Sequence, residues 1–123
     1  MTWITPSLAW MLYRSGYGAK PGQERVLKIK LTHEAVVHLL SECQLKQTGT
    51  DEAKETGRVQ WDPERSLYQS EPGKKEPMKL SGTRAIQIGI GGSLSERYVD
   101  SIVSIEEVTD LAHKFMAAHA LKS

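Results

Sequence analysis

The sequence lacks most of the features that would assign it to a class of protein at once. Its single cysteine, Cys43, cannot form a disulfide within the 123-residue chain. Because disulfides are typical of proteins in oxidising compartments, this favours a cytoplasmic protein. No apolar run approaches the roughly 20 residues that a helix needs to cross a membrane. We therefore expect no membrane partner.

An excess of charge of one sign is also lacking. Lys and Arg total 16, and Asp and Glu total 15, which gives a net charge of +1. So balanced a chain has no general attraction for nucleic acid or an anionic membrane, and any anion site must be built locally. A hydrophobic fraction of 39% and a charged fraction of 25% are typical of a soluble globular protein. The length predicts one domain over residues 1–123.

The segment Thr2–Gly16 holds two of the three tryptophans and predicts a short apolar helix. Thr5 is suited to cap this helix, Pro6 to occupy its first position, and Gly16 to end it. An aromatic stripe at helical spacing usually belongs to a core. In the alternative interpretation, three side chains of this segment line the mouth of a pocket: Trp3, Trp10 and Arg14.

Hydrophobic periodicity and turn residues predict the other elements. Arg25–Leu31 alternates as a strand with one wet face. Leu27, Ile29 and Leu31 are predicted to point inward, and Val26, Lys28 and Lys30 outward. Thr32 is suited to cap the helix that follows. The later elements are a strand at Arg58–Asp62 ended by Pro63, a strand at Arg84–Ile90, a helix at Ser93–Ser101, a strand at Ile102–Val108 and a last helix capped by Thr109. Two polar segments are predicted to be long exposed loops, Gln44–Gly57 and Ser66–Thr83.

The resulting order, α-β-α-β-β-α-β-α, indicates a small α+β domain with helices packed on a mixed or antiparallel sheet. The segment Ile102–Val108 has an alternative, because Ser104 and Glu107 make a capping-box pattern that would start a helix at Ile105. Its β-branched residues favour the strand. Alternation predicts one core, formed by Trp10, Leu27, Ile29, Trp61, Ile86, Ile88, Val103 and Ile105, and an outward position for Gln87 and Gly89.

Motifs for metal or phosphate binding are weak. His33 and His38 lie five residues apart, about 140° around a helix, so they do not form the zinc pair of a protease motif, and we expect no metal. Gly89–Ser93 joins a strand to a helix, and free backbone N–H groups around Gly91 would suit a phosphate or carboxylate. Arg84 precedes this junction and could add charge-assisted bonds. A plain tight turn is the alternative.

A second predicted anion site joins Arg14 and Arg25. Arg14 ends the first helix, and Gln23 lies at the start of the next strand after a short loop, so the chain is expected to return close to where it left. Arginine is suited to a planar grip on phosphate or carboxylate. We therefore predict that the two arginines share an open pocket with Trp3 or Trp10. The alternative is that both arginines only hold the fold, through Glu24 or Asp62.

Several stretches in order resemble the domain-of-unknown-function family 4291. They are Met1–Ile4, Pro6–Ser7, Trp10–Met11, Tyr13–Gly16, Gln23–Leu27, Val59–Arg65, Ile86–Gly89, Tyr98–Val99 and Ile102–Thr109. The resemblance implies a cytosolic, single-domain α+β protein without an established activity. Family members begin upstream with a strand and helix rich in Tyr, Gln and Ala, so the resemblance also implies that this chain is truncated.

The family pattern is distantly similar to the ADP-ribosyltransferase superfamily, whose members hold NAD between two small sheets. That similarity would match a catalytic acid to Glu106 or Glu107, and Glu107 would then stabilise a ribosyl cation. Phosphates would be bound by Arg14, Gln23, Arg25 and Arg84, and a base would stack on Trp3, Trp10 or Trp61. The alternatives are a non-catalytic module for RNA or a phosphorylated ligand, and a structural or protein-interaction domain.

Overall fold

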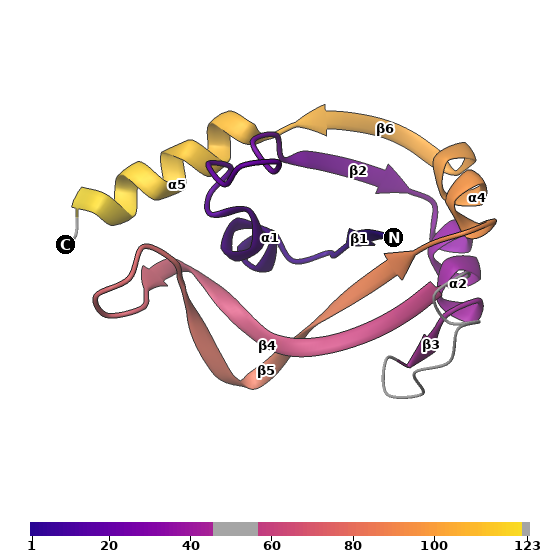
Figure 1. Cartoon of the computed structure of the whole chain (residues 1–123), viewed down its shortest axis with the longest axis horizontal. Coiled ribbons are helices and arrows are strands. Elements are labelled where there is room, and N and C mark those ends of the chain that lie inside the picture. Colours follow the sequence, from indigo (N-terminus) through magenta and orange to yellow (C-terminus); the bar gives the residue numbers. More distant parts are fainter. Residues whose placement is uncertain (46–56, 122–123) are drawn as a thin grey trace. The chain divides into compact units, whose positions relative to one another are not determined.

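The computed structural model describes residues 1–45 and 57–121. Its elements, in chain order, are β1 (Thr2–Ile4), α1 (Leu8–Ser15), β2 (Leu27–Leu31), α2 (His33–Ser41), β3 (Gln44–Leu45), β4 (Gly57–Ser70), β5 (Pro77–Ile90), α4 (Leu94–Asp100), β6 (Ile102–Glu107) and α5 (Thr109–Leu121) (Figure 1). The predicted α+β class is confirmed. The predicted order recurs, with β1 and β3 added.

The strands form a mixed four-stranded sheet and a second sheet of two strands. The four-stranded sheet has the order β1-β5-β4-β3, and the two-stranded sheet joins β2 to β6. β1 runs antiparallel to β5, with Thr2 opposite Ile90, whereas β3 runs parallel to β4. The strand predicted at the segment before α5 is confirmed as β6, so the alternative helix starting at Ile105 is wrong.

Capping side chains set the ends of the first two helices. Ser7 caps α1, because its hydroxyl accepts a hydrogen bond from the backbone N–H of Trp10 at 3.1 Å. The predicted cap, Thr5, instead donates its hydroxyl to the carbonyl oxygen of Ile86 at 2.8 Å. Thr32 caps α2 as predicted, accepting from the N–H of Ala35 at 3.1 Å.

A left-handed turn follows α1. Gly16, the predicted end of the helix, has φ +58°, and the next two residues, Tyr17 and Gly18, have φ +59° and +74°. Positive φ is rare for a bulky side chain. Tyr17 is nevertheless only 1% exposed, so burial of its ring accompanies this unfavourable backbone.

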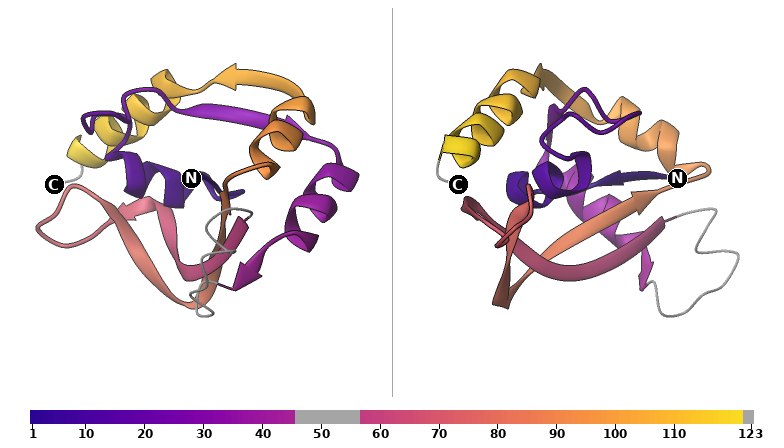
Figure 2. Two further views of the ribbon diagram at one scale, coloured as in Figure 1. Left: turned by 45° about the vertical axis from the view of Figure 1, so that its right-hand side comes forward. Right: turned by 60° about the vertical axis from the view of Figure 1, so that its left-hand side comes forward.

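The largest correction concerns the hairpin of β4 and β5, seen from two sides in Figure 2. Pro63 was predicted to end a short strand and Ser66–Thr83 to be a loop, but both strands run for 14 residues. Backbone hydrogen bonds between β4 and β5 hold this polar segment in an extended conformation, although it buries few apolar side chains. In the described chain, β3 pairs with β4 only at Arg58 and Val59. Pro63, which has no backbone N–H, therefore interrupts no hydrogen bond between these two strands.

The other predicted loop, Gln44–Gly57, falls partly outside the described residues. Gln44 and Leu45 form β3, and Gly57 is buried at the start of β4. A Cβ on Gly57 would lie 2.8 Å from the sulfur of Cys43 and 3.0 Å from Cδ2 of Leu94. The close approach of these neighbours explains why a glycine occupies this position.

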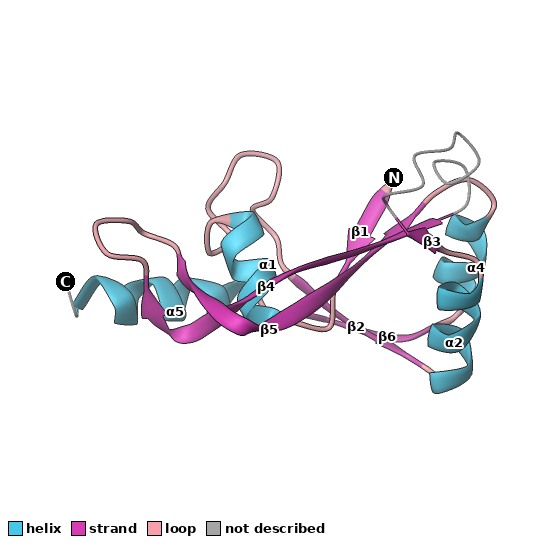
Figure 3. Ribbon diagram, turned by 90° about the horizontal axis from the view of Figure 1, so that it is seen from below, coloured by secondary structure: helices cyan, strands magenta, loops and turns pink. Residues whose placement is uncertain are grey.

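Two compact units divide the chain, and each has its own core. Unit 1 comprises Met1–Pro6, Ile29–Asp62 and Ile86–Ile105. Its buried cluster is formed by Leu39, Ile88, Ile90, Leu94 and Tyr98. The helices α2 and α4 that contribute to this cluster lie side by side (Figure 3).

Unit 2 comprises Ser7–Lys28, Pro63–Ala85 and Glu106–Ser123. Its buried cluster is formed by Leu12, Tyr17, Val26 and Ala112. The strands β2, β4, β5 and β6 each contribute residues to both units.

The prediction of a single core is therefore wrong. Of its eight residues, Ile29, Ile86 and Ile88 belong to the cluster of unit 1. Four others are about half exposed: Leu27 at 48%, Trp61 at 51%, Val103 at 56% and Ile105 at 57%.

Local departures from strand alternation explain the errors. Val26, which was predicted to face outward, lies just before β2 and is 4% exposed, while Leu27 points to solvent. At the end of β5 both faces are covered, because Gln87 is 4% exposed and Gly89 is buried. Their predicted outward position is also wrong.

Candidate functional site

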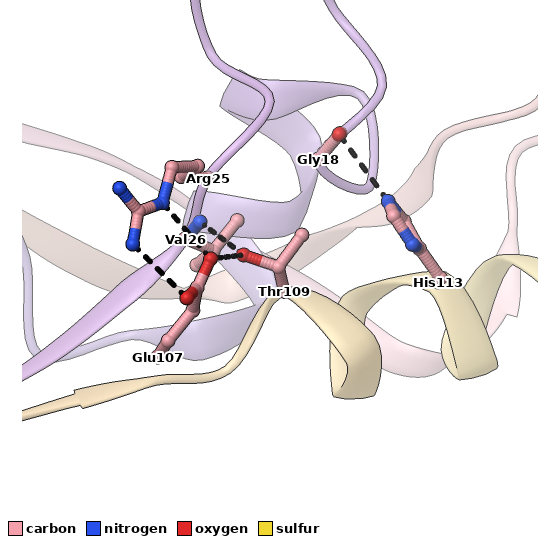
Figure 4. A network of polar contacts seen from close by, with 6 residues as sticks. All are labelled: Gly18, Arg25, Val26, Glu107, Thr109 and His113. Carbon is pink, nitrogen blue, oxygen red and sulfur yellow. Dashed lines mark hydrogen bonds and ion pairs between the residues drawn. The ribbon is translucent and has the colours of Figure 1, made fainter.

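A polar cluster in unit 2 brings together two predicted site residues, Arg25 and Glu107 (Figure 4). Nε of Arg25 donates to Oε1 of Glu107 at 3.0 Å, and a second guanidinium nitrogen donates to Oε2 at 3.0 Å. Thr109 donates its hydroxyl to Oε1 of Glu107 at 3.1 Å and accepts from the N–H of Val26 at 2.9 Å. The ion pair therefore helps to join the segment before β2 to the start of α5.

This contact keeps both groups charged. Hydrogen bonds from Arg25 and then from Thr109 lower the pKa of Glu107, and Glu107 raises the pKa of Arg25. The two side chains are 75% and 46% exposed, so solvent screens the attraction and its contribution to stability is small. Since both carboxylate oxygens are engaged, the fork of Arg25 faces Glu107 rather than an external anion.

The cluster extends to His113 on α5. Its Nε2 atom lies 3.4 Å from the carbonyl oxygen of Gly18, a long contact (Figure 4). A Cβ on Gly18 would lie 3.5 to 3.6 Å from side-chain atoms of Val26, His113 and Thr109. The left-handed turn therefore packs closely against the start of α5, and the cluster has a role in holding unit 2 together.

The predicted aromatic residues lie in different surroundings. Trp10 contacts Tyr13 edge to face, with ring centroids 5.6 Å apart, and the guanidinium carbon of Arg65 lies 3.6 Å from the centroid of Tyr13. Trp3 stands opposite Gly89 in the sheet of unit 1, and a Cβ on that glycine would come within 2.9 Å of its ring. Trp3 therefore covers a glycine in the sheet of unit 1, whereas Trp10 belongs to unit 2.

The remaining predicted residues fall at separate places. Arg14 is exposed on α1, and Gln23 is half-buried in the loop that follows. Trp61 is half exposed on β4. The alternative in which Arg25 holds the fold agrees with its contacts, but the acid is Glu107 instead of Glu24 or Asp62.

The junction at Gly91 forms a tight turn. The N–H of Leu94 donates to the carbonyl oxygen of Gly91 at 3.1 Å, and the N–H of Ser95 donates to that of Gly92 at 3.2 Å. These two donors at the start of α4 therefore already have partners within the turn. This geometry agrees with the alternative of a plain turn at this position.

A cleft with a volume of about 590 Å³ lies along β5 in unit 2. It is lined by one residue of β4 and six consecutive residues of β5: Pro63, Lys79, Leu80, Ser81, Gly82, Thr83 and Arg84. Two lining residues are cationic, Lys79 and Arg84, and none is acidic. Both of them, and the hydroxyl residues between them, are exposed. Arg84 was named from the sequence as a flank of the Gly91 junction and not of this cleft, and Lys79 was missed because that segment was predicted to be a loop.

A second cleft, of about 360 Å³, lies in unit 1. Its lining carries both signs of charge, with Glu42 and Glu96 against Arg97. Arg97 also contacts Nε2 of His38 through a guanidinium nitrogen. This cleft therefore combines charges of both signs, unlike the cleft along β5.

Metal and membrane sites were also sought in residues 1–45 and 57–121. Within these ranges, His, Cys, Asp and Glu side chains do not gather in groups of three or more that could hold a metal ion. The helices of the same ranges are all too short or too polar to cross a membrane.

Comparison with known proteins gives one match. The family model described as Domain of unknown function (DUF4291) matches residues 1–123, which is the whole chain. No curated protein and no solved structure matches the chain. The resemblance seen in the sequence is thus confirmed at the level of the family, and the chain belongs to the DUF4291 family.

Proposed function

We propose that this protein binds the phosphate groups of a nucleotide or nucleic acid in the cleft along β5. The observation that carries the proposal is the lining of this cleft, in which Lys79 and Arg84 are the only charged residues. Because the whole chain has a net charge of only +1, this concentration of positive charge is local. An arginine fork and a lysine ammonium are the usual partners of phosphate oxygens in proteins.

The side chains between the two cations suit the same ligand. Ser81 and Thr83 place hydroxyl groups, which donate hydrogen bonds to phosphate oxygens, along the same cleft. The cleft is open, so an anion can enter without a rearrangement of the strand. The cleft in unit 1 is a weaker candidate because its two carboxylates oppose an anionic ligand.

ADP-ribosyl transfer with NAD as cofactor and Glu107 as the catalytic acid stays a prediction from the resemblance. Both oxygens of Glu107 accept hydrogen bonds from Arg25, so a catalytic role would need this pair to open. The same applies to a phosphate contact through Arg25. Phosphate binding along β5 does not need any contact of the fold to break.

The test is calorimetric titration of the full chain with ATP, NAD and inorganic pyrophosphate. Arg84→Met keeps an apolar stem and removes the charge, and the loss of a charge-assisted hydrogen bond should weaken binding roughly tenfold to hundredfold. Lys79→Met should act in the same direction. Lys114→Met is the matched control, because Lys114 is exposed on α5 and does not line the cleft.

The melting temperature of each variant keeps the result interpretable. Arg84 and Lys79 are exposed, so the variants should stay within about 0.5 kcal/mol of the wild type in stability. Unchanged binding in Arg84→Met, or wild-type protein that binds none of the three compounds, would contradict the proposal. Binding that is lost in Arg25→Met, and kept in Arg84→Met, would move the site to the cluster at Glu107.

A further inference from the structure

We infer that the ligand of the cleft along β5 is a single-stranded nucleic acid, bound through several backbone phosphates without recognition of its bases. This inference rests on the proposed function and specifies its ligand class. The lining consists of six consecutive residues of one strand and one proline. A cleft of this form follows the length of β5, so it presents its donors in a row along the strand.

The order of residues along β5 matches a chain of phosphates. Lys79 and Arg84 lie at the two ends of the lining segment, and Ser81 and Thr83 lie between them. At about 3.3 Å per residue, an extended segment of this length spans up to roughly 16 Å. The donors are thus distributed over a length that suits successive phosphates better than one compact anion.

Arginine, lysine and hydroxyl side chains can contact base edges, but the lining lacks the other groups that recognise a base. Aromatic side chains, on which bases stack, and carboxamide or carboxylate side chains, which bind base edges, are absent from it. A mononucleotide would therefore gain little from its base in this cleft. A polymer gains affinity from each additional phosphate, which favours a nucleic acid strand over a free nucleotide.

Gly82 interrupts the regular strand conformation between the two cations. In a regular strand, side chains separated by an odd number of residues point to opposite faces, and Lys79 and Arg84 are five residues apart in the sequence. Both nevertheless line the cleft, and between them Gly82 has φ +80°. A left-handed glycine within a strand is typical of a bulge, which redirects the side chains that follow it. Gly82 is therefore a positioning residue.

One carboxylate lies close to this row of donors. Oε1 of Glu71 accepts the backbone N–H of Lys79 at 2.8 Å. Glu71 is thus held against the backbone, it is not among the lining residues, and the side chain of Lys79 remains exposed. The ammonium group is therefore available to a phosphate.

The experiment measures fluorescence anisotropy of labelled U12 and dT12 with the full chain over a series of salt concentrations. For single strands, the slope of log K against log salt changes by about 0.7 for each phosphate neutralised. The wild type should show a slope of about −1.4 or steeper. Lys79→Met and Arg84→Met should each make the slope shallower by about 0.7, and Lys114→Met should leave it unchanged. The ratio of the U12 and dT12 affinities assigns the ligand to RNA or DNA.

A pair of glycine variants tests the positioning role separately from charge. Gly82 and Gly73 both have positive φ, +80° and +74°, and a Cβ on either would meet no atom within 4 Å. Gly82→Ala and Gly73→Ala therefore carry a similar backbone penalty without a clash. Only Gly82→Ala should shift the salt slope towards that of Arg84→Met, because Gly73 lies outside the cleft lining.

The outcomes separate this inference from the proposed function. If ATP or pyrophosphate binds in an Arg84-dependent way but U12 and dT12 bind no more tightly, the inference is overturned and the proposed function stands. If the oligonucleotides bind with slopes unaffected by Lys79→Met and Arg84→Met, the inference is overturned, and ATP or pyrophosphate binding that is likewise unaffected overturns the proposed function as well. A polyglutamate peptide that binds as tightly as U12 would assign the cleft to acidic proteins and overturn the inference.

Discussion

Each of the two compact units is stabilised internally by a different kind of contact. In unit 1, four aliphatic residues and Tyr98, from the end of β5 and from α2 and α4, form the buried cluster. Unit 2 adds specific polar contacts between segments far apart in the sequence to its small cluster: Ser7 donates to Glu64 at 2.6 Å, Arg65 stacks on Tyr13, and Arg25 pairs with Glu107. The stability of unit 1 thus rests mainly on apolar residues buried between its helices and strand. The stability of unit 2 rests also on individual pairs of polar side chains.

The largest effects should come from the apolar cores themselves. Leu39 in unit 1 and Leu12 in unit 2 are 1% and 0% exposed, and replacing either by Ala should cost about 2–5 kcal/mol. Urea denaturation followed by circular dichroism measures this loss. Leu40→Ala is the control, because Leu40 follows Leu39 on α2 but is 38% exposed. Equal losses for Leu39→Ala and Leu40→Ala would contradict the core of unit 1.

A smaller loss should follow from breaking a polar contact of unit 2. Arg65→Met removes the cation over Tyr13 and the hydrogen bond to the carbonyl oxygen of Pro77, which is 3.2 Å long. The expected cost is about 1–2 kcal/mol. Arg14→Met on α1 is the control, since Arg14 is exposed and its change should stay within about 0.5 kcal/mol. If the two variants melt alike, the stacking of Arg65 does not stabilise unit 2.

A tryptophan on β4 tests how far unit 1 depends on burial. If Trp61 were fully buried, its replacement by Ala would lower the free energy of unfolding by about 3–5 kcal/mol. Because Trp61 is 51% exposed, we expect about 1 kcal/mol instead, a fraction of what full burial of a large apolar side chain contributes. Chemical denaturation of Trp61→Ala, with Ile88→Ala as the buried comparison at 5% exposure, measures the difference. A loss above that of Ile88→Ala would place Trp61 in a core after all.

The smallest effect should come from the ion pair of unit 2. The pKa of Glu107 is lowered in the folded protein, so its contribution is present above the ordinary carboxyl pKa and is lost as pH falls through the lowered value. The melting temperatures of wild type and Glu107→Gln should therefore differ slightly near pH 7 and converge as the pH falls below the ordinary carboxyl range. Glu106→Gln, which changes the preceding exposed acid, should show no such convergence.

The contrast between the units also explains what the sequence could predict. The helix after Thr32 and the helix before Ser101 belong to unit 1, as do residues 86–90 at the end of β5. Local signals predicted them: a capping residue, a Gly-Gly turn and β-branched alternation. The hairpin of unit 2 was missed because Ser66–Thr83 is polar and interrupted by prolines. Its strands are specified by each other, and no local pattern records that pairing.

The same limit applies to the candidate site, because contacts between segments that are distant in the sequence leave no local signal. Arg84 was singled out as a flank of the Gly91 junction, and the cleft along β5 was not expected because Lys79 belonged to a segment without periodicity. The partner of Arg25 was predicted to be Glu24 or Asp62, but it is Glu107, which lies 82 residues away in the sequence. The type of contact was therefore right and the residue wrong. The bulge at Gly82 could not be inferred either, because an isolated glycine in a polar run is typical of a loop.

The left-handed turn after α1 has a consequence for the order in which the protein folds. An unfolded chain seldom places a tyrosine at positive φ, since this conformation costs roughly 1–2 kcal/mol per residue for L-amino acids. Tyr17 therefore adopts it only when its ring is buried, and the cluster that buries it includes Ala112 of α5. Contacts between such distant parts of a chain form slowly. During synthesis, the core of unit 2 can therefore close only after α5 has left the ribosome.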